Sequence, residues 1–167
     1  IPANAFSGCD NFEYFDLPES LTQIQQETFM GCTGLSEMVI PAKVETIGSK
    51  AFSGCSGLTS VTLNDGLKTI GSSAFYGCAR LTSIHIPDSV TAIMSSAFMN
   101  CSKLAECNYP VGWTKATDSS FYSNVFAGTL LKTLEIPEGI KAIPANAFSG
   151  CDNFEYFDLP ESLTQIQ

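Results

Sequence analysis

Apolar side chains return along this chain at a nearly fixed interval. The clearest series is a phenylalanine within a segment similar to AF-x-G-C, which recurs at i, i+23 through the first five members. One longer step and one slightly shorter step complete the register, which holds Phe6, Phe29, Phe52, Phe75, Phe98, Phe126 and Phe148. A constant period between about 20 and 50 residues is typical of solenoids, in which each repeat forms one coil. We therefore predict a stack of coils with the phenylalanines in one internal column.

The pattern within one coil predicts its first strand. In the third coil, Leu58, Val61 and Leu63 have the L-x-x-L-x-L spacing of a leucine-rich repeat strand. Thr62 lies between the last two, and this alternation fits a half-buried strand. A turn should follow, because most coils have a proline there, and proline cannot donate to a strand ladder.

The rest of the coil predicts a second short extended segment and then a compact apolar cluster. Leu67 and Ile70 mark the extended segment. Four apolar side chains then have the spacing i, i+4, i+5, i+8, namely Ile70, Ala74, Phe75 and Cys78. That spacing predicts one face of a short helical segment. The expected fold class is an α/β-type repeat: a solenoid of about seven 23-residue coils, with a parallel β-sheet on one face and short helical turns opposite.

A longer repeat lies above the coil repeat. Residues 1–25 recur letter for letter as residues 143–167. One coil, at about residues 108–126, is irregular and longer than the others. We expect residues 1–167 to form a single solenoid domain that is a piece of a longer tandem array.

Six of the seven cysteines occupy one position, the third after each phenylalanine: Cys9, Cys32, Cys55, Cys78, Cys101 and Cys151. A metal site, a disulfide framework and a buried thiol ladder are the three interpretations. The sequence has no C-x-x-C pair, which is the usual zinc spacing. Cysteines in adjacent coils would lie about 5 Å apart, whereas disulfides need Cβ atoms about 3.8 Å apart. We favour the thiol ladder, and we expect no metal and no cofactor.

The text LTSVTLNDGLKTIGSSAFYGC and its relatives closely resemble the BspA-like leucine-rich repeats, also called the Treponema-type class. The resemblance covers the whole chain, in which one coil is irregular. It implies a secreted or surface-exposed protein associated with adhesion to host matrix proteins, to cells or to other microbes. It implies no catalytic residues. Ordinary leucine-rich repeats carry an asparagine ladder after the strand, and here the cysteine column takes the equivalent inner place.

Composition and charge limit the classes of function and partner that fit this chain. Apolar residues make up 44% and charged residues 15% of the chain, which argues against disorder. The net charge of −9 argues against nucleic acid and anionic membranes. No apolar run is long enough to cross a bilayer. A single histidine leaves little room for acid–base chemistry, so we expect no enzyme.

The outward positions of the predicted strand form two columns. The first contains Tyr14, Glu37, Ser60, Ser83, Glu106, Thr133 and Tyr156, and the second contains Asp16, Val39, Thr62, His85, Asn108, Glu135 and Asp158. Solenoids usually bind partners on such a continuous face. The candidate binding residues in these columns are Tyr14, Glu37, Thr62, His85, Asn108, Glu135 and Tyr156. The alternative is a soluble surface with nothing bound to it.

The irregular coil is a second candidate, because it contains Trp113, Phe121 and Tyr122. Extra length in a repeat often forms a loop on the binding face. Exposed Trp113 and Tyr122 would then stack on a sugar or anchor a protein. Alternatively, Trp113 folds back and covers the gap left by the irregular coil.

The main functional hypothesis is a non-catalytic adhesion or recognition module at the cell surface or after secretion. Its partners would be extracellular proteins, either host matrix or microbial surface proteins. The alternatives are a ligand-free spacer in a surface array and a glycan binder that uses the Trp113 loop. We also expect head-to-tail association between copies of this chain, because a solenoid without caps has open edges.

Overall fold

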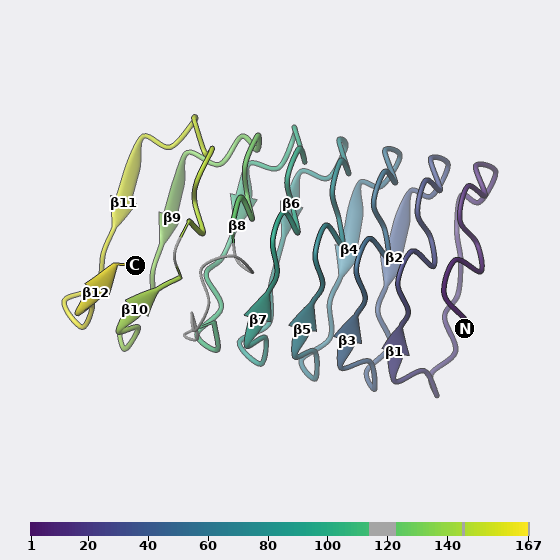
Figure 1. Ribbon diagram of the computed structural model, residues 1–167, viewed down its shortest axis with the longest axis horizontal. Helices are drawn as coiled ribbons and strands as arrows, with labels where there is room; N and C mark the ends of the chain where they lie inside the picture. Colours follow the sequence, from purple (N-terminus) through teal and green to yellow (C-terminus); the bar gives the residue numbers. More distant parts are fainter. Residues whose placement is uncertain (114–122, 145, 167) are drawn as a thin grey trace.

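The computed structural model describes residues 1–113, 123–144 and 146–166, and in it the chain winds as a stack of coils with two rows of strands (Figure 1). The first row, which we call the sheet face, comprises β2 (Glu37–Val39), β4 (Ser60–Thr62), β6 (Ser83–Ile84), β8 (Glu106–Cys107), β9 (Thr133–Glu135) and β11 (Tyr156–Asp158). The second row comprises β1 (Gln23–Ile24), β3 (Thr46–Ile47), β5 (Thr69–Ile70), β7 (Ala92–Ile93), β10 (Ala142–Ile143) and β12 (Gln165–Ile166).

All strand pairs are parallel and join neighbouring coils. On the sheet face the pairs are β2–β4, β6–β8 and β9–β11, and in the second row β1, β3, β5 and β7 form one continuous sheet. The register is that of the sequence repeat, since Met38 pairs with Val61 and Val39 pairs with Thr62. In β2 and β4 the central residue is buried and its two neighbours are exposed. The alternation of apolar and polar residues therefore sets which side chains reach the core.

Six coils, and not the expected seven, contribute a strand to the sheet face of the described structure. The first outward register, residues 14–16, lies before β2 without becoming a strand. In that region a hydrogen bond runs from the Ser36 amide to the Glu13 carbonyl (3.1 Å). No parallel ladder forms between residues 14–16 and β2 within the described ranges, so the first coil lacks a sheet-face strand.

The predicted helical segment is wrong: the described residues contain no helix. In a helix each amide would bond four residues back along its own chain. Here alternate amides bond the next coil instead, as Phe75 N–H does to the Ala97 carbonyl (2.8 Å). The amides between them close short turns, as Cys78 N–H does to the Phe75 carbonyl (3.2 Å). Half of the donors that a helix needs are thus used to join coils.

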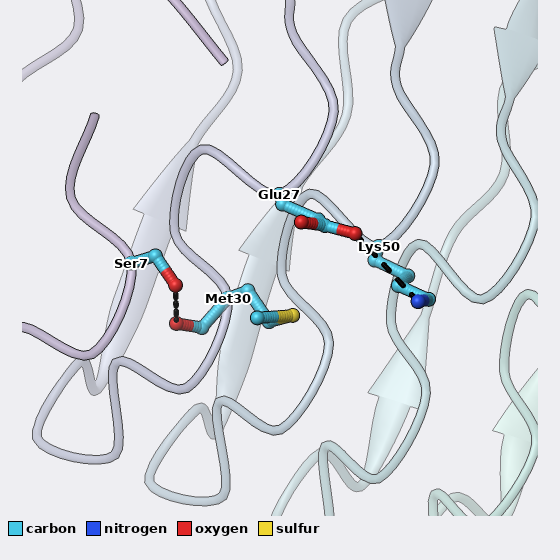
Figure 2. Close-up of polar contacts among 4 residues, drawn as sticks. All are labelled: Ser7, Glu27, Met30 and Lys50. Carbon is cyan, nitrogen blue, oxygen red and sulfur yellow. Dashed lines mark hydrogen bonds and ion pairs between the residues drawn. The ribbon is translucent and has the colours of Figure 1, made fainter. Parts of the chain in front are cut away.

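This turn edge also carries residues in the left-handed backbone region. Glu27 and Lys50 occupy equivalent positions with φ of 55° and 54°. Figure 2 shows that their side chains form an ion pair, with Lys50 Nζ 3.6 Å from Glu27 Oε1. In the same view Ser7 donates a hydrogen bond to the Met30 carbonyl (3.2 Å). Polar contacts at this edge therefore join successive coils on the outside of the stack.

The phenylalanine column lies inside the stack. Phe29, Phe52, Phe75, Phe98 and Phe126 are fully or almost fully buried. Neighbouring rings from Phe29 to Phe98 are 5.3 Å apart and parallel to within 5°. Phe6 and Phe148, in the first and last coils, are partly buried and continue the column.

The thiols form a second internal column beside the rings. Cys32, Cys55, Cys78 and Cys101 are fully buried, Cys9, Cys107 and Cys151 are partly buried, and all seven are free. Each of the four buried thiols donates to the phenylalanine carbonyl of the preceding coil; the distance from Cys55 Sγ to the Phe29 oxygen is 3.0 Å. The Phe29 carbonyl oxygen also accepts a hydrogen bond from the Cys32 amide of its own coil (3.2 Å). The thiol therefore satisfies the second lone pair of a buried carbonyl, so the column is neither a disulfide framework nor void filling alone.

Close approach of the coils explains a repeated glycine. A Cβ atom on Gly71 would lie 2.7 Å from the carbonyl carbon of Gly48 and 2.7 Å from the amide nitrogen of Ser49. Gly48 has the same relation to Gln25 and Gln26 in the preceding coil. Any side chain at these positions would push two coils apart.

Within the described ranges, no helix is long and apolar enough to cross a membrane.

Candidate binding surface

The sheet face is a continuous polar ribbon. All seven residues of the first column are exposed, and in the second column Asn108 is half-buried while the other six are exposed. The predicted residues Tyr14, Glu37, Thr62, His85, Glu135 and Tyr156 therefore lie on one surface. Tyr14 donates a short hydrogen bond to the Asp16 carboxylate, and this bond raises the pKa of the Tyr14 phenol.

A hollow of this surface lies where β8 is followed by β9. We call it the strand-end groove; its volume is about 410 Å³, and it is lined by His85, Asp88, Cys107, Asn108, Tyr109, Val111, Glu135 and Pro137. Three of the predicted binding residues, His85, Asn108 and Glu135, are thus brought together. Two neighbouring hollows continue it along the sheet face, one over β6 and β8 and one over β9 and β11.

An irregular junction opens the groove. Glu106 and Thr133 hold the same register position in successive coils, but more chain separates them than separates Ser83 from Glu106. Among the described residues no backbone ladder joins β8 to β9, and none joins β4 to β6 either; at the irregular junction the Leu130 amide bonds the Leu104 carbonyl (2.8 Å) ahead of the strands. The interruption leaves the facing edges of β8 and β9 without ladder partners in that part of the chain.

Asn108 has a structural role that the sequence did not reveal. Its Oδ1 accepts the Ile86 amide (2.7 Å) and its Nδ2 donates to the Ile86 carbonyl (2.8 Å). In an earlier coil the equivalent amide, that of Ile40, bonds the Thr62 backbone carbonyl (2.9 Å). The Asn108 side chain thus takes the place of backbone pairing, and its polar atoms are engaged within the protein.

Asp88, Val111 and Pro137 complete the groove and were missed as binding candidates. They lie in the turns after β6, β8 and β9. Asp88 Oδ1 accepts the Val111 amide (3.0 Å), so the carboxylate is fixed in position. The longer spacing of the irregular coil was the sequence signal for a groove here, but it was assigned to the Trp113 loop.

Trp113 is not an exposed binding residue. Its side chain is fully buried, with ring centroids 6.4 Å from Phe126 and 6.5 Å from Phe148 in edge-on geometry. Those two phenylalanine rings are 6.1 Å apart, wider than the 5.3 Å of regular coils, and the indole packs beside this widened step. The Tyr109 hydroxyl donates to the Trp113 carbonyl (2.8 Å) and closes the turn. Trp113 therefore covers the gap of the irregular coil, while Tyr122 lies outside the described residues.

The protonation of several cysteine thiols follows from their burial. Burial raises the pKa of the Cys55 thiol to about 12, so the thiol stays protonated at neutral pH. Burial likewise raises the pKa of Cys107 and of Cys151. In the described ranges no three His, Cys, Asp or Glu side chains are grouped so that they could hold a metal ion.

Comparison with known structures supports the same fold. A leucine-rich repeat protein of Treponema pallidum is 29% identical, with a TM-score of 0.73 over 90% of this chain and 71% of that one. A leucine-rich repeat protein of Bacteroides ovatus is 26% identical, with a TM-score of 0.71 over 97% of this chain and 47% of that one. A chain described as a leucine-rich cell surface protein, from Faecalibacterium prausnitzii, is 31% identical, with a TM-score of 0.55 over 90% of this chain and 52% of that one. This chain thus spans about half of the length of the last two.

No curated protein sequence matches the chain. The family model described as "BspA type Leucine rich repeat region" matches residues 1–125 and 120–167. The match spans both the regular coils and the irregular one, and it agrees with the phenylalanine and cysteine columns seen in the core. The chain is therefore a member of the BspA-type leucine-rich repeat family.

Proposed function

We propose that this solenoid is a non-catalytic recognition module that binds an extracellular protein through its sheet face. The observation that carries the proposal is the pair of outward columns, in which thirteen of fourteen residues are exposed and which is hollowed at the strand-end groove. Flat polar ribbons of this kind serve repeat proteins as extended binding surfaces. The family and its leucine-rich repeat relatives support a binding role over catalysis.

We further propose that the module works at the cell surface or after secretion. The support is the Faecalibacterium relative, which is described as a cell surface protein. Protease treatment of intact cells that make the full-length protein tests this proposal. An antibody against residues 26–48 should lose its signal in intact cells, whereas a signal that disappears only after lysis would place the protein inside.

The binding proposal is tested with three substitutions on the sheet face, Glu37→Ala, Thr62→Ala and His85→Ala, made together. Surface plasmon resonance against a panel of purified extracellular-matrix and microbial surface proteins should find a partner for the wild-type chain. The triple variant should weaken that binding at least about fivefold, which corresponds to about 1 kcal/mol, the loss expected if one of the three side chains is an important contact.

A matched control is available elsewhere on the same coils. Glu45, Lys68 and Thr91 are exposed and hold one register position beside the second row of strands. Replacing these three by alanine should leave binding unchanged. Equal losses in both triple variants would contradict binding through the sheet face, and absence of binding across the panel would favour the spacer alternative. The glycan alternative required an exposed Trp113, and this side chain is buried.

A further inference from the structure

The strand-end groove differs from the rest of the sheet face in its shape and in the charges around it. Its lining includes the carboxylates Asp88 and Glu135, and none of its described lining residues is lysine or arginine. Its described lining also contains one histidine, His85. The volume of about 410 Å³ lies within the range of about 300–1,000 Å³ typical of pockets that hold small groups.

The charge of the groove continues along the face. The two outward columns contain five acidic residues, namely Asp16, Glu37, Glu106, Glu135 and Asp158, and no lysine or arginine. Seven of the eight basic residues belong to the described part of the chain, and none of these seven stands in the two columns. A one-signed field over a concave surface attracts the opposite charge and repels its own. The partner segment that fits is therefore basic.

The backbone around the groove indicates the shape of that segment. No ladder joins β8 to β9 in the described part of the chain, so strand edges without ladder partners lie beside the groove, although the same is true of β4 and β6. Asp88 remains in place because it accepts the Val111 amide, and Glu135 lies on β9 itself. Asp88 and Glu135 lie on the coils of β6 and β9, on either side of the coil of β8, so both carboxylates are available to cationic side chains of one segment bound in the groove.

We propose that the strand-end groove binds an extended segment of a partner protein that carries two lysine or arginine residues, with Asp88 and Glu135 as their ion-pair partners. This inference rests on the proposed function, because it names the chemistry of the partner that the sheet face recognises. Arginine suits the site best, since its planar guanidinium pairs with a carboxylate through two hydrogen bonds.

The test uses a short fluorescein-labelled Gly/Ser peptide with two arginines separated by one other residue, and fluorescence anisotropy as the readout. The same peptide with citrulline in place of both arginines is the uncharged control. The Asp88→Asn, Glu135→Gln double variant of the whole chain should bind the arginine peptide at least about fivefold more weakly than wild type. Asparagine at 88 keeps an acceptor for the Val111 amide, so the groove keeps its shape.

Two acidic residues in the same registers one coil away provide the matched control. Asp65 holds the register of Asp88 in the preceding coil, and Asp158 is the strand partner of Glu135 in the following coil. Neither lines the strand-end groove. The Asp65→Asn, Asp158→Asn variant has the same net charge as the groove variant, so it should bind the peptide like wild type if the groove is the site.

Three outcomes would overturn the proposal. These are equal weakening in the two double variants, equal binding of the citrulline peptide, and displacement of the peptide by spermidine at similar concentration, which would assign the groove to small polycations. Failure here is distinguishable from failure of the general proposal. A chain that binds a matrix protein through Glu37, Thr62 and His85 but ignores the arginine peptide would keep the sheet face as a binding surface and reject basic recognition.

Discussion

Replacing Phe75 by alanine removes one ring from the middle of the phenylalanine column. The side chain is fully buried, and its ring lies 5.3 Å from that of Phe52 and 5.3 Å from that of Phe98. Truncation of a buried phenylalanine to alanine typically costs about 3–5 kcal/mol. Two stacking contacts of about 0.5–1.5 kcal/mol each are lost with it, so we expect the upper half of that range.

The assay is urea unfolding at constant pH, followed by far-ultraviolet circular dichroism and by the fluorescence of Trp113. This tryptophan packs against Phe126 and Phe148, more than one coil away from the mutated ring. If the stack unfolds as one cooperative unit, both signals should shift together to lower urea. If neighbouring coils are only weakly coupled, circular dichroism should shift first.

Phe6→Ala is the matched control, because Phe6 belongs to the same column but is only partly buried. Its effect should be clearly smaller than that of Phe75→Ala. A loss below about 1 kcal/mol for Phe75→Ala, or equal losses for the two variants, would show that the ring column does not hold the coils together.

Further predictions concern the thiols, the coil contacts, the tryptophan and association. Cys78→Ala should cost about 1–3 kcal/mol in urea unfolding because it leaves a buried carbonyl with one partner fewer, and Cys78→Ser should cost less than alanine if hydrogen bonding dominates over packing. Since burial raises the folded-state pKa of Cys55 from 9.0 to about 12, the thiol binds its proton more tightly in the folded state, and stability should fall as pH rises from 9 towards 12; stability that is flat across this window would contradict burial of the thiol. Gly71→Ala should cost about 1–3 kcal/mol by forcing two coils apart, and a neutral result in thermal unfolding would refute the close approach. Trp113→Ala should cost about 3–5 kcal/mol, whereas Trp113→Phe should be milder, because the indole N–H has no hydrogen-bond partner among the described residues. Light scattering of the whole chain at rising concentration should detect head-to-tail association, and a constant monomer mass would reject it.

Most of the fold was predictable because one side chain repeats at one position. The phenylalanine spacing indicated the coil length, and the alternation around Thr62 indicated the side of the strand that faces solvent. The spacing of Ala74, Phe75 and Cys78 was misleading as a helix signal. A chain of turns with alternate amides bonded to the next coil buries the same residues as a helical face. Apolar spacing alone therefore does not distinguish bonds within a coil from bonds between coils.

The candidate site was less predictable, because one outward residue can serve either a ligand or the protein's own backbone. Asn108 has the register of a surface residue, but its amide pairs with Ile86. In the sequence, Trp113 is compatible with an exposed loop and with a buried position in the core. Its burial depends on the wider spacing between the Phe126 and Phe148 rings, which the sequence does not show. The strand-end groove required knowledge of where the ladder between β8 and β9 is interrupted, which no single position in the sequence reveals.

The hydrogen bond from each buried thiol to the carbonyl one coil earlier has a consequence for how such proteins change over generations. Every regular junction presents the same thiol to the same carbonyl, so coils are interchangeable building blocks. Unequal recombination between repeats can then insert or delete whole coils while recreating a junction that already exists. The length of the solenoid can therefore vary by inheritance while the interior keeps the same contacts.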